Sequence, residues 1–360
     1  MELDTEKHKF RVAIVGATGL VGSEILSILD EKGFPCDEIL AFASEESRGT
    51  RLQWRGEPDA LRVDIVNAAA LETCDLIFSA APEGVTKRHL QPFGARRGVV
   101  IDCSSSARFH DGVPLIVAGV NTSELDENVR YIATPGAIAA LVAPVVDAIR
   151  RLTVPVSIFG TVFVSASHQG RAGMDELSAQ TVGLLNQTEY PTTVFSERLA
   201  FNVHGRVGGT LKGGGGSELE LQAVKELRTV LDEPELEIDI LAAQIPVFSG
   251  ISAHISVVGS KSITKENLVA ELDTCPGFWL TSDEERPTLD QVGQRDDIQV
   301  SRLRVSPDGK RIGMWIATDN LRRGSALNAV KIAEHLVSDG LIPTLKDRVR
   351  PEKFRTVRLA

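Results

Sequence analysis

RVAIVGATGLVG, at residues 11–22, predicts a buried β-strand that runs through a glycine-rich turn into a helix. Residues 12–15 are apolar and mostly β-branched, which is typical of a strand buried on both faces of a parallel sheet. Residues 23–29 then place apolar side chains at helical spacing. Glycines in this context let the backbone turn tightly and approach a pyrophosphate, whose charge is met by amides at the helix N-terminus. The alternative is a tight turn that binds nothing. We predict a dinucleotide site at Gly16, Ala17, Thr18, Gly19, Leu20, Val21 and Gly22.

The segment after the next predicted strand, residues 38–43, bears on the choice of cofactor. In a dinucleotide-binding fold an acid here accepts from the 2′-hydroxyl of NAD, whereas an arginine pairs with the 2′-phosphate of NADP. Both signals are present, in Glu45 or Glu46 and in Arg48. We expect NAD, or a relaxed choice between NAD and NADP, because a carboxylate repels a phosphate. Either glutamate could equally be a solvated loop charge. Ser44 and Glu45 are the predicted cofactor contacts.

Two more strands, at residues 75–81 and 98–102, continue the pattern, with a crossover helix expected over residues 86–97. The alternation of strand and helix predicts a Rossmann-like, doubly wound parallel sheet over about the first 130 residues. Ligands of such sheets lie at the carboxyl ends of the strands. We therefore also expect Ser79 and Ala80 beside the cofactor.

From about Pro155 the expected strands become longer, which predicts a second, α+β domain with a large mixed sheet. The glycine-rich loop 208–216 leads into a helix, for which Ser217 is the expected N-cap and Glu220 the capping-box partner. The overall fold class is therefore α/β, with a Rossmann-like domain followed by an α+β domain. The strands expected in the second domain are residues 156–166, 238–248 and 298–305, and an expected helix of this domain covers residues 174–185. A further amphipathic helix is expected over residues 326–336, near the end of the chain.

Composition limits the classes of function. The 360 residues are enough for about two domains, and a net charge of −10 argues against a nucleic-acid partner, which needs a basic face. Residues 1–9 are polar and charged, unlike a signal peptide, and no apolar run is long enough for a membrane span. We expect a cytoplasmic protein with no membrane partner. No metal is expected, because the histidines lack ligand spacing and Cys36, Cys74, Cys103 and Cys275 form no CxxC motif.

Five segments together resemble the aspartate-semialdehyde dehydrogenase family of amino-acid biosynthesis, over nearly the whole chain. The most specific is DNLRRGSALNAVKIAE at residues 319–334, because the family's closing motif reads DNLRKGAALNAVQIAE or close to it. The other segments are residues 12–22, 101–108, 113–121 and 170–177.

The resemblance carries expectations for domains and partners. It implies a Rossmann domain over residues 1–134 that is completed by the C-terminal helix within residues 322–360. A dimerisation domain of the semialdehyde-dehydrogenase type would cover residues 135–321. The resemblance also implies a homodimer that binds NAD or NADP, with Asn320 of the closing motif at the cofactor.

The chemistry of that family needs reactive groups that this chain lacks. The resemblance implies a cysteine thiolate that adds to the aldehyde, hydride transfer to NADP, cleavage of the thioester by phosphate, and a histidine base. It also implies a glutamine and an arginine that position the substrate, and an arginine and a lysine that bind phosphate. The phosphate-loop arginine is retained as Arg108. The cysteine, histidine, substrate arginine, glutamine and lysine positions fall, in that order, on Ala137, Ile251, Gln244, Val164 and Gln222.

We therefore identify the chain as a member of the catalytically incomplete, USG-type branch of this family, a pseudoenzyme that binds NAD(P) without phosphorylating dehydrogenase activity. One alternative is an oxidoreductase on another small substrate, with Cys103 or His168 as the reactive group. A second is a regulatory partner of a true aspartate-semialdehyde dehydrogenase. A third is a misplaced gap that hides a nearby nucleophile. His254 offers no replacement base, because its spacing from Ile251 puts it on the other face of the strand.

Overall fold

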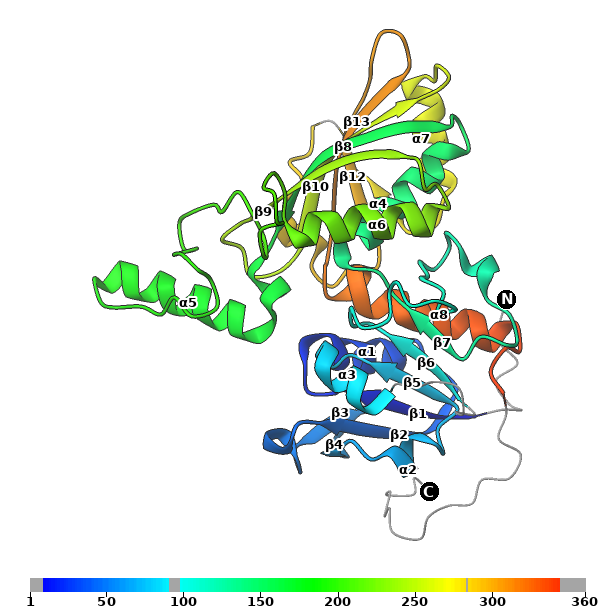
Figure 1. Cartoon of the computed structure of the whole chain (residues 1–360), viewed down its shortest axis with the longest axis vertical. Helices are drawn as coiled ribbons and strands as arrows, with labels where there is room; N and C mark the ends of the chain where they lie inside the picture. Colours follow the sequence, from blue (N-terminus) through cyan, green and yellow to red (C-terminus); the bar gives the residue numbers. More distant parts are fainter. Residues whose placement is uncertain (1–8, 91–97, 283, 344–360) are drawn as a thin grey trace. The chain divides into compact units, whose positions relative to one another are not determined.

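The computed structural model describes residues 9–90, 98–282 and 284–343. Pro135–Ser325 form one compact unit, and the residues before and after them form the other. Each unit contains one β-sheet (Figure 1). Arg322, near the end of the second unit, pairs with Asp296 of the same unit at 2.6 Å. Among the described residues, no helix has the length and apolar character needed to cross a membrane.

The first unit contains a seven-stranded sheet in the order β3-β4-β2-β1-β5-β6-β7. Pairing from β4 through β7 is parallel, which confirms the doubly wound sheet. The β3–β4 hairpin is antiparallel and was not predicted, since its strands are largely polar and exposed. The strands are β1 (Phe10–Val15), β2 (Cys36–Ala43), β3 (Arg51–Trp54), β4 (Glu57–Ile65), β5 (Leu76–Ser79), β6 (Val99–Asp102) and β7 (Tyr131–Ala133).

The C-terminal helix α8 (Leu327–Ser338) belongs to the core of this first unit. Its Asn328 side chain accepts from the Ala118 amide at 2.8 Å and donates to the Ile116 carbonyl at 2.9 Å. The crossover helix expected over residues 86–97 begins earlier, at Glu83, and residues 91–97 lie outside the described part of the chain. The other helices are α1 (Leu20–Glu31), α2 (Ala68–Leu71) and α3 (Glu83–Leu90), with short 3-10 turns η1 (Glu45–Ser47) and η2 (Thr122–Glu124).

The second unit contains the predicted mixed sheet, six strands in the order β11-β12-β13-β10-β8-β9. The β8–β9 and β11–β12 pairs are parallel, and the remaining pairs are antiparallel. The strands are β8 (Pro155–Val164), β9 (Glu237–Gln244), β10 (Ile251–Gly259), β11 (Phe278–Leu280), β12 (Ile298–Val305) and β13 (Arg311–Thr318).

Helices α4 (Ala137–Arg150) and α6 (Glu218–Leu231) lie along this sheet, whereas α5 (Gly170–Asn186) stands away from it (Figure 1). The predicted capping box at the start of α6 is confirmed, since the Ser217 and Glu220 side chains exchange hydrogen bonds with each other's backbone. The remaining elements are α7 (Lys265–Thr274), the 3-10 turns η3 (Ala166–Gln169) and η4 (Leu289–Val292), and the π-helix η5 (Arg322–Ala326).

The two faces of the six-stranded sheet differ in burial. On the covered face, Ile251, Ala253, Ile255 and Val257 of β10 are all buried. The other face carries the alternate residues of β10, among them His254, together with the residues paired opposite them, and we call it the open face. Because residues directly opposite each other on paired strands share a face, the paired residues of the sheet can be assigned to one face from the strand register.

Candidate functional site

The glycine turn between β1 and α1 is too tightly packed to accept side chains. Gly16 has a φ of +89°, and a Cβ there would lie 2.6 Å from the Ala80 carbonyl oxygen. A Cβ at Gly22 would lie 2.1 Å from the Gly16 carbonyl oxygen. At Gly19, the N-cap of α1, a Cβ would meet only the Gly16 oxygen, at 3.2 Å, apart from its chain neighbours. The turn is therefore closed on the sheet side and open at the head of α1, as a pyrophosphate requires.

The loop after β2 is tied to the glycine turn. Thr18 donates to the Ser47 hydroxyl at 3.2 Å. The Arg48 guanidinium lies between two carboxylates, Glu45 at 3.3 Å and Asp64 at 3.4 Å. In the sequence Glu45 and Arg48 are opposing signals for the choice of cofactor, whereas in the structure their side chains form an ion pair.

The carboxyl end of β5 borders the same turn. Ala80 donates its backbone N–H to the Val15 carbonyl at 2.8 Å. Ser79 is fully buried, and its hydroxyl shares a 2.9 Å hydrogen bond with Thr86. The structure therefore places Ala80 against the turn but shows a structural bond for the Ser79 hydroxyl.

The serine loop after β6 is organised around a buried carboxylate that sequence reasoning missed. Asp102 accepts from the Ser104 amide at 2.8 Å, and from the Ser106 and Tyr131 hydroxyls at 2.6 Å each. Cys103 follows it, and Arg108 donates to the Cys103 carbonyl at 3.4 Å. Burial, and then the negative charge of Asp102, raise the pKa of the Cys103 thiol to about 12.

Five positions are those at which the resemblance implies a family side chain that this chain lacks, and we call them the substituted positions. Three of them are direct neighbours on the covered face of the second sheet. Val164 of β8 is paired with Ile251 of β10 on one side and with Gln244 of β9 on the other, and all three are buried. The Gln244 side chain donates to the Val164 carbonyl at 2.9 Å. We call these three the substituted row. It contains no nucleophile and no titratable side chain.

The other two substituted positions are linked through a buried glutamate. Ala137 is the first residue of α4, whose N-cap is Gly136. The Gly136 amide donates to one oxygen of Glu226 and the Gln222 side chain to the other, both at 2.8 Å. Glu226 was not predicted. The sequence does contain a signal for it, because Glu226 follows Gln222 by four residues, and residues four apart on a helix lie next to each other.

Asn320 and Gly250 hold the chain before Ile251 in place. The Gly250 amide donates to the Asn320 side-chain oxygen at 2.7 Å, and the Asn320 amide donates to the Ser167 hydroxyl at 2.9 Å. All the observed partners of Asn320 lie in the second unit, so its expected role at the cofactor stays a prediction. His168, next to Ser167, is exposed.

The misplaced-gap alternative needs a reactive residue near the substituted row. The single cysteine of the second unit, Cys275, contacts Arg151 at 3.4 Å, just beyond the C-terminus of α4. The 14 residues of α4 put that end about 20 Å from Ala137. His204 pairs with Gln244 through the backbone and was missed by sequence reasoning, and its ring nitrogen lies 3.0 Å from the Arg198 carbonyl. His254 lies on the open face, as predicted.

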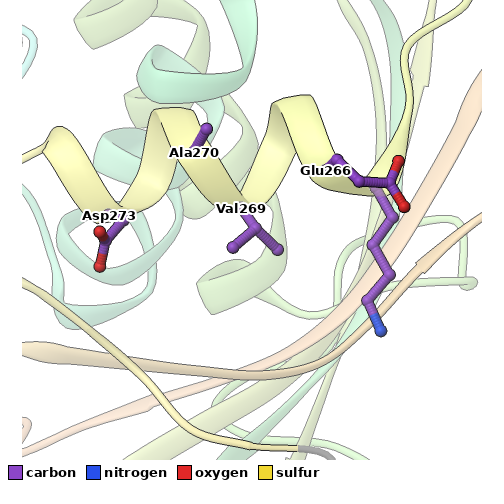
Figure 2. A pocket seen from close by; sticks show the side chains of 5 residues that line it. Glu266, Val269, Ala270 and Asp273 are labelled. Carbon is purple, nitrogen blue, oxygen red and sulfur yellow. The ribbon is translucent and has the colours of Figure 1, made fainter.

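A surface pocket on α7 is unrelated to these positions. Figure 2 shows that its lining consists of side chains from a single helix, and none of them was predicted as a site residue. The lining residues are Lys265, Glu266, Val269, Ala270 and Asp273.

Comparison with known protein families divides the chain into two parts that correspond to the two structural units. Residues 11–128 match the family described as "Semialdehyde dehydrogenase, NAD binding domain", and residues 143–323 match "Semialdehyde dehydrogenase, dimerisation domain". The chain is 35% identical to a USG-1 protein homolog of Azotobacter vinelandii over 334 residues, which cover 91% of this chain and 98% of the relative.

Two further relatives come from Vibrio cholerae. Aspartate-semialdehyde dehydrogenase 2 is 35% identical over 344 residues, covering 92% of this chain and 99% of the relative. The crystal structure of aspartate semialdehyde dehydrogenase II superimposes with a TM-score of 0.87 at 30% identity, covering 92% of this chain and 99% of that one. The glycine turn, the two sheets and these matches together show that the chain belongs to the aspartate-semialdehyde dehydrogenase-related family, with its NAD-binding and dimerisation domains.

Proposed function

We propose that this protein binds NAD or NADP and does not catalyse the phosphorylating oxidation of aspartate semialdehyde. The observation that carries the proposal is the substituted row beside a helix that begins with Ala137. A methyl group at the head of α4 cannot form a thioester. An isoleucine and an amide at positions 251 and 244 supply neither a proton acceptor nor a positive charge for an anionic substrate.

The decisive test is a direct assay with aspartate semialdehyde, phosphate and NAD or NADP. We expect no reduced cofactor above a blank without protein, at protein concentrations high enough to detect a very slow enzyme. A genuine aspartate-semialdehyde dehydrogenase serves as the positive control in the same buffer. Robust formation of reduced cofactor would overturn the proposal.

Binding of the dinucleotide is tested separately by calorimetric titration with NAD and with NADP. We expect NAD to bind at least as well, because Glu45 and Asp64 flank Arg48 and would oppose a 2′-phosphate beside it. If neither NAD nor NADP gives a heat of binding, the first unit has only a structural role. Much tighter binding of NADP would show that Arg48 leaves its carboxylates to meet the phosphate.

We also propose that the protein is a homodimer formed through the second unit. Apolar side chains lie exposed on the open face, with Phe159 39% and Leu241 54% exposed, and exposed apolar patches mark interaction surfaces. Light scattering coupled to size-exclusion chromatography should give twice the mass of the chain, 38.9 kDa. A mass equal to one chain at all concentrations would contradict the homodimer.

Two other functions have less support. An oxidoreductase that uses Cys103 would need a thiolate, which its raised pKa of about 12 opposes at neutral pH. If a screen finds any activity, the Cys103→Ser and His168→Gln variants decide whether these residues carry it.

A regulatory partner of a true dehydrogenase would co-purify with that enzyme from the source cell. Recovery of the homodimer alone would argue against that role.

A further inference from the structure

The loop after β2 lies directly beside the glycine turn in the first unit. The amides of Gly16 and Ala17 both donate to the Phe42 carbonyl near the end of β2, at 2.8 and 3.0 Å. In the 3-10 turn η1, the Ser47 hydroxyl accepts from Thr18 at 3.2 Å. In folds of this type the adenosine ribose of a dinucleotide lies at the end of the second strand. The element that would meet the 2′ position of that ribose is therefore η1.

One side of η1 is occupied by an ion-pair cluster. A 3-10 helix has three residues per turn, so residues three apart lie on the same side of it. Glu45 and Arg48 have this spacing, and their side chains are 3.3 Å apart. Arg48 also lies 3.4 Å from Asp64 of β4. The Glu45 carboxylate is therefore paired on the side of η1 that faces β4.

Glu46 occupies another side of the same turn. With three residues per turn, it is separated by about 120° both from the Glu45 side and from Ser47, which faces the glycine turn. The Glu46 side chain is exposed. Among the residues that the structure describes, none forms a hydrogen bond or an ion pair with its carboxylate. Of the two glutamates in this loop, Glu46 is thus the one whose carboxylate is available to a ligand.

We propose that Glu46, rather than Glu45, accepts a hydrogen bond from the 2′-hydroxyl of the adenosine ribose and makes the site selective for NAD. This inference rests on the proposed binding of a dinucleotide and adds the residue that selects between NAD and NADP. The 2′-phosphate of NADP would bring a negative charge against the Glu46 carboxylate. Arg48 does not offset this repulsion, because Glu45 and Asp64 already supply two carboxylates to its one guanidinium.

Calorimetric titration of two Glu46 variants with NAD and with NADP tests the assignment. Glu46→Gln keeps the size of the side chain and removes its charge, so we expect the affinity for NAD to fall by about tenfold. Glu46→Arg places a cation at the 2′ position. We expect it to reverse the preference, with the ratio of NADP to NAD affinity raised by about a hundredfold or more.

Glu45→Gln makes the same change one residue earlier and tests the competing assignment. We expect it to lower the affinity for NAD less than Glu46→Gln does. Glu57→Gln is the matched control, because Glu57 is an exposed acid at the opposite end of β4 from Asp64. It should bind both dinucleotides like the wild type. Circular dichroism melting of each variant separates a loss of affinity from a loss of fold.

The outcomes distinguish this inference from the binding on which it rests. A wild type that binds neither NAD nor NADP contradicts dinucleotide binding itself. A wild type that binds NAD, with affinities that are unchanged in both Glu46 variants, overturns the role of Glu46 alone. A larger loss from Glu45→Gln than from Glu46→Gln assigns the contact to Glu45, and tighter binding of NADP than of NAD by the wild type contradicts the selectivity.

Discussion

A thiol at position 137 would stand at the first turn of α4, next to the amide that donates to Glu226. A helix N-terminus lowers the pKa of a thiol, whereas the nearby carboxylate raises it. Under the proposed function, the positions expected to hold the base and the substrate arginine would remain Ile251 and Gln244. We therefore expect Ala137→Cys to show no turnover with aspartate semialdehyde, measured as reduced cofactor against a blank. Turnover from this single change would mean that the substituted row is not needed for the chemistry.

Gly16 gives a sharper test of the glycine turn. Gly16→Ala places a methyl group 2.6 Å from the Ala80 carbonyl at a φ of +89°, so both a clash and backbone strain oppose it. We expect a loss of about 2–4 kcal/mol in the free energy of urea unfolding, since strain of this kind alone costs about 1–3 kcal/mol. Gly33→Ala is the matched control, with a φ of +59° and nothing within 4 Å of the new Cβ. Equal losses for the two variants would show that the contact with Ala80 is unimportant.

His254 makes the stability of the second unit depend on pH. Burial, followed by the positive charges of Arg304 and Arg302, holds the pKa of His254 below its ordinary value of 6.5. The folded chain thus binds this proton less readily than the unfolded chain. The contribution of the neutral His254 ring to the free energy of unfolding is therefore fully present above the ordinary pKa. It is lost as the pH falls through the lowered pKa of the folded state.

The measurement is urea unfolding of the wild type and His254→Gln at about pH 7.5 and about pH 5.5. Thr161 and Trp315, the residues paired on either side of His254, carry no charge that would offset its proton. We expect the wild type to lose more stability than the variant on acidification. Parallel losses in the two proteins would assign the acid sensitivity to other groups.

At the scale of elements, prediction from sequence was most accurate where local signals were strong. The strand before the glycine turn and the capped helix after loop 208–216 were both placed within a residue. The expected strand 156–166 ends earlier, at Val164, because its last residues enter a 3-10 turn. The β3–β4 hairpin was missed because its residues lack an apolar alternation that marks a buried strand.

The candidate site was less predictable for a physical reason. Sequence motifs locate positions such as Gly16 and Ala137, but not which distant side chains meet them. Asp102, Glu226 and His204 were all missed, and each has at least one hydrogen-bond partner on another element, which a single sequence does not reveal. The adjacency of Val164, Gln244 and Ile251 likewise depends on strand register, which a single sequence does not specify for long mixed sheets.

The capping box of α6 connects that helix to the sheet, which gives a prediction at this scale. Glu220 accepts from the Ser217 amide with one oxygen and from the Ala242 amide of β9, at 2.8 Å, with the other. Ser217→Ala removes only the cap and should cost about 1 kcal/mol. Glu220→Ala leaves two amides without an acceptor, at about 1–3 kcal/mol each when buried. Urea unfolding should therefore show Glu220→Ala as the more damaging change, and the reverse order would contradict the link between α6 and β9.

For the whole molecule, the proposed function assigns nucleotide binding to the first unit and no dehydrogenase chemistry to the second, so nucleotide binding should respond to mutations in the glycine turn and not to mutations at position 137. A dinucleotide at a hundred times its Kd stabilises the unit that binds it by about 2.7 kcal/mol. We expect NAD to raise the melting temperature of the wild type and of Ala137→Cys by the same amount, and to leave Gly16→Ala unchanged. Calorimetric scanning is the suitable measurement, because units that unfold separately appear as separate transitions. A shift that Ala137→Cys abolishes would show that the second unit also holds the nucleotide, and the division of roles between the two units would then be wrong.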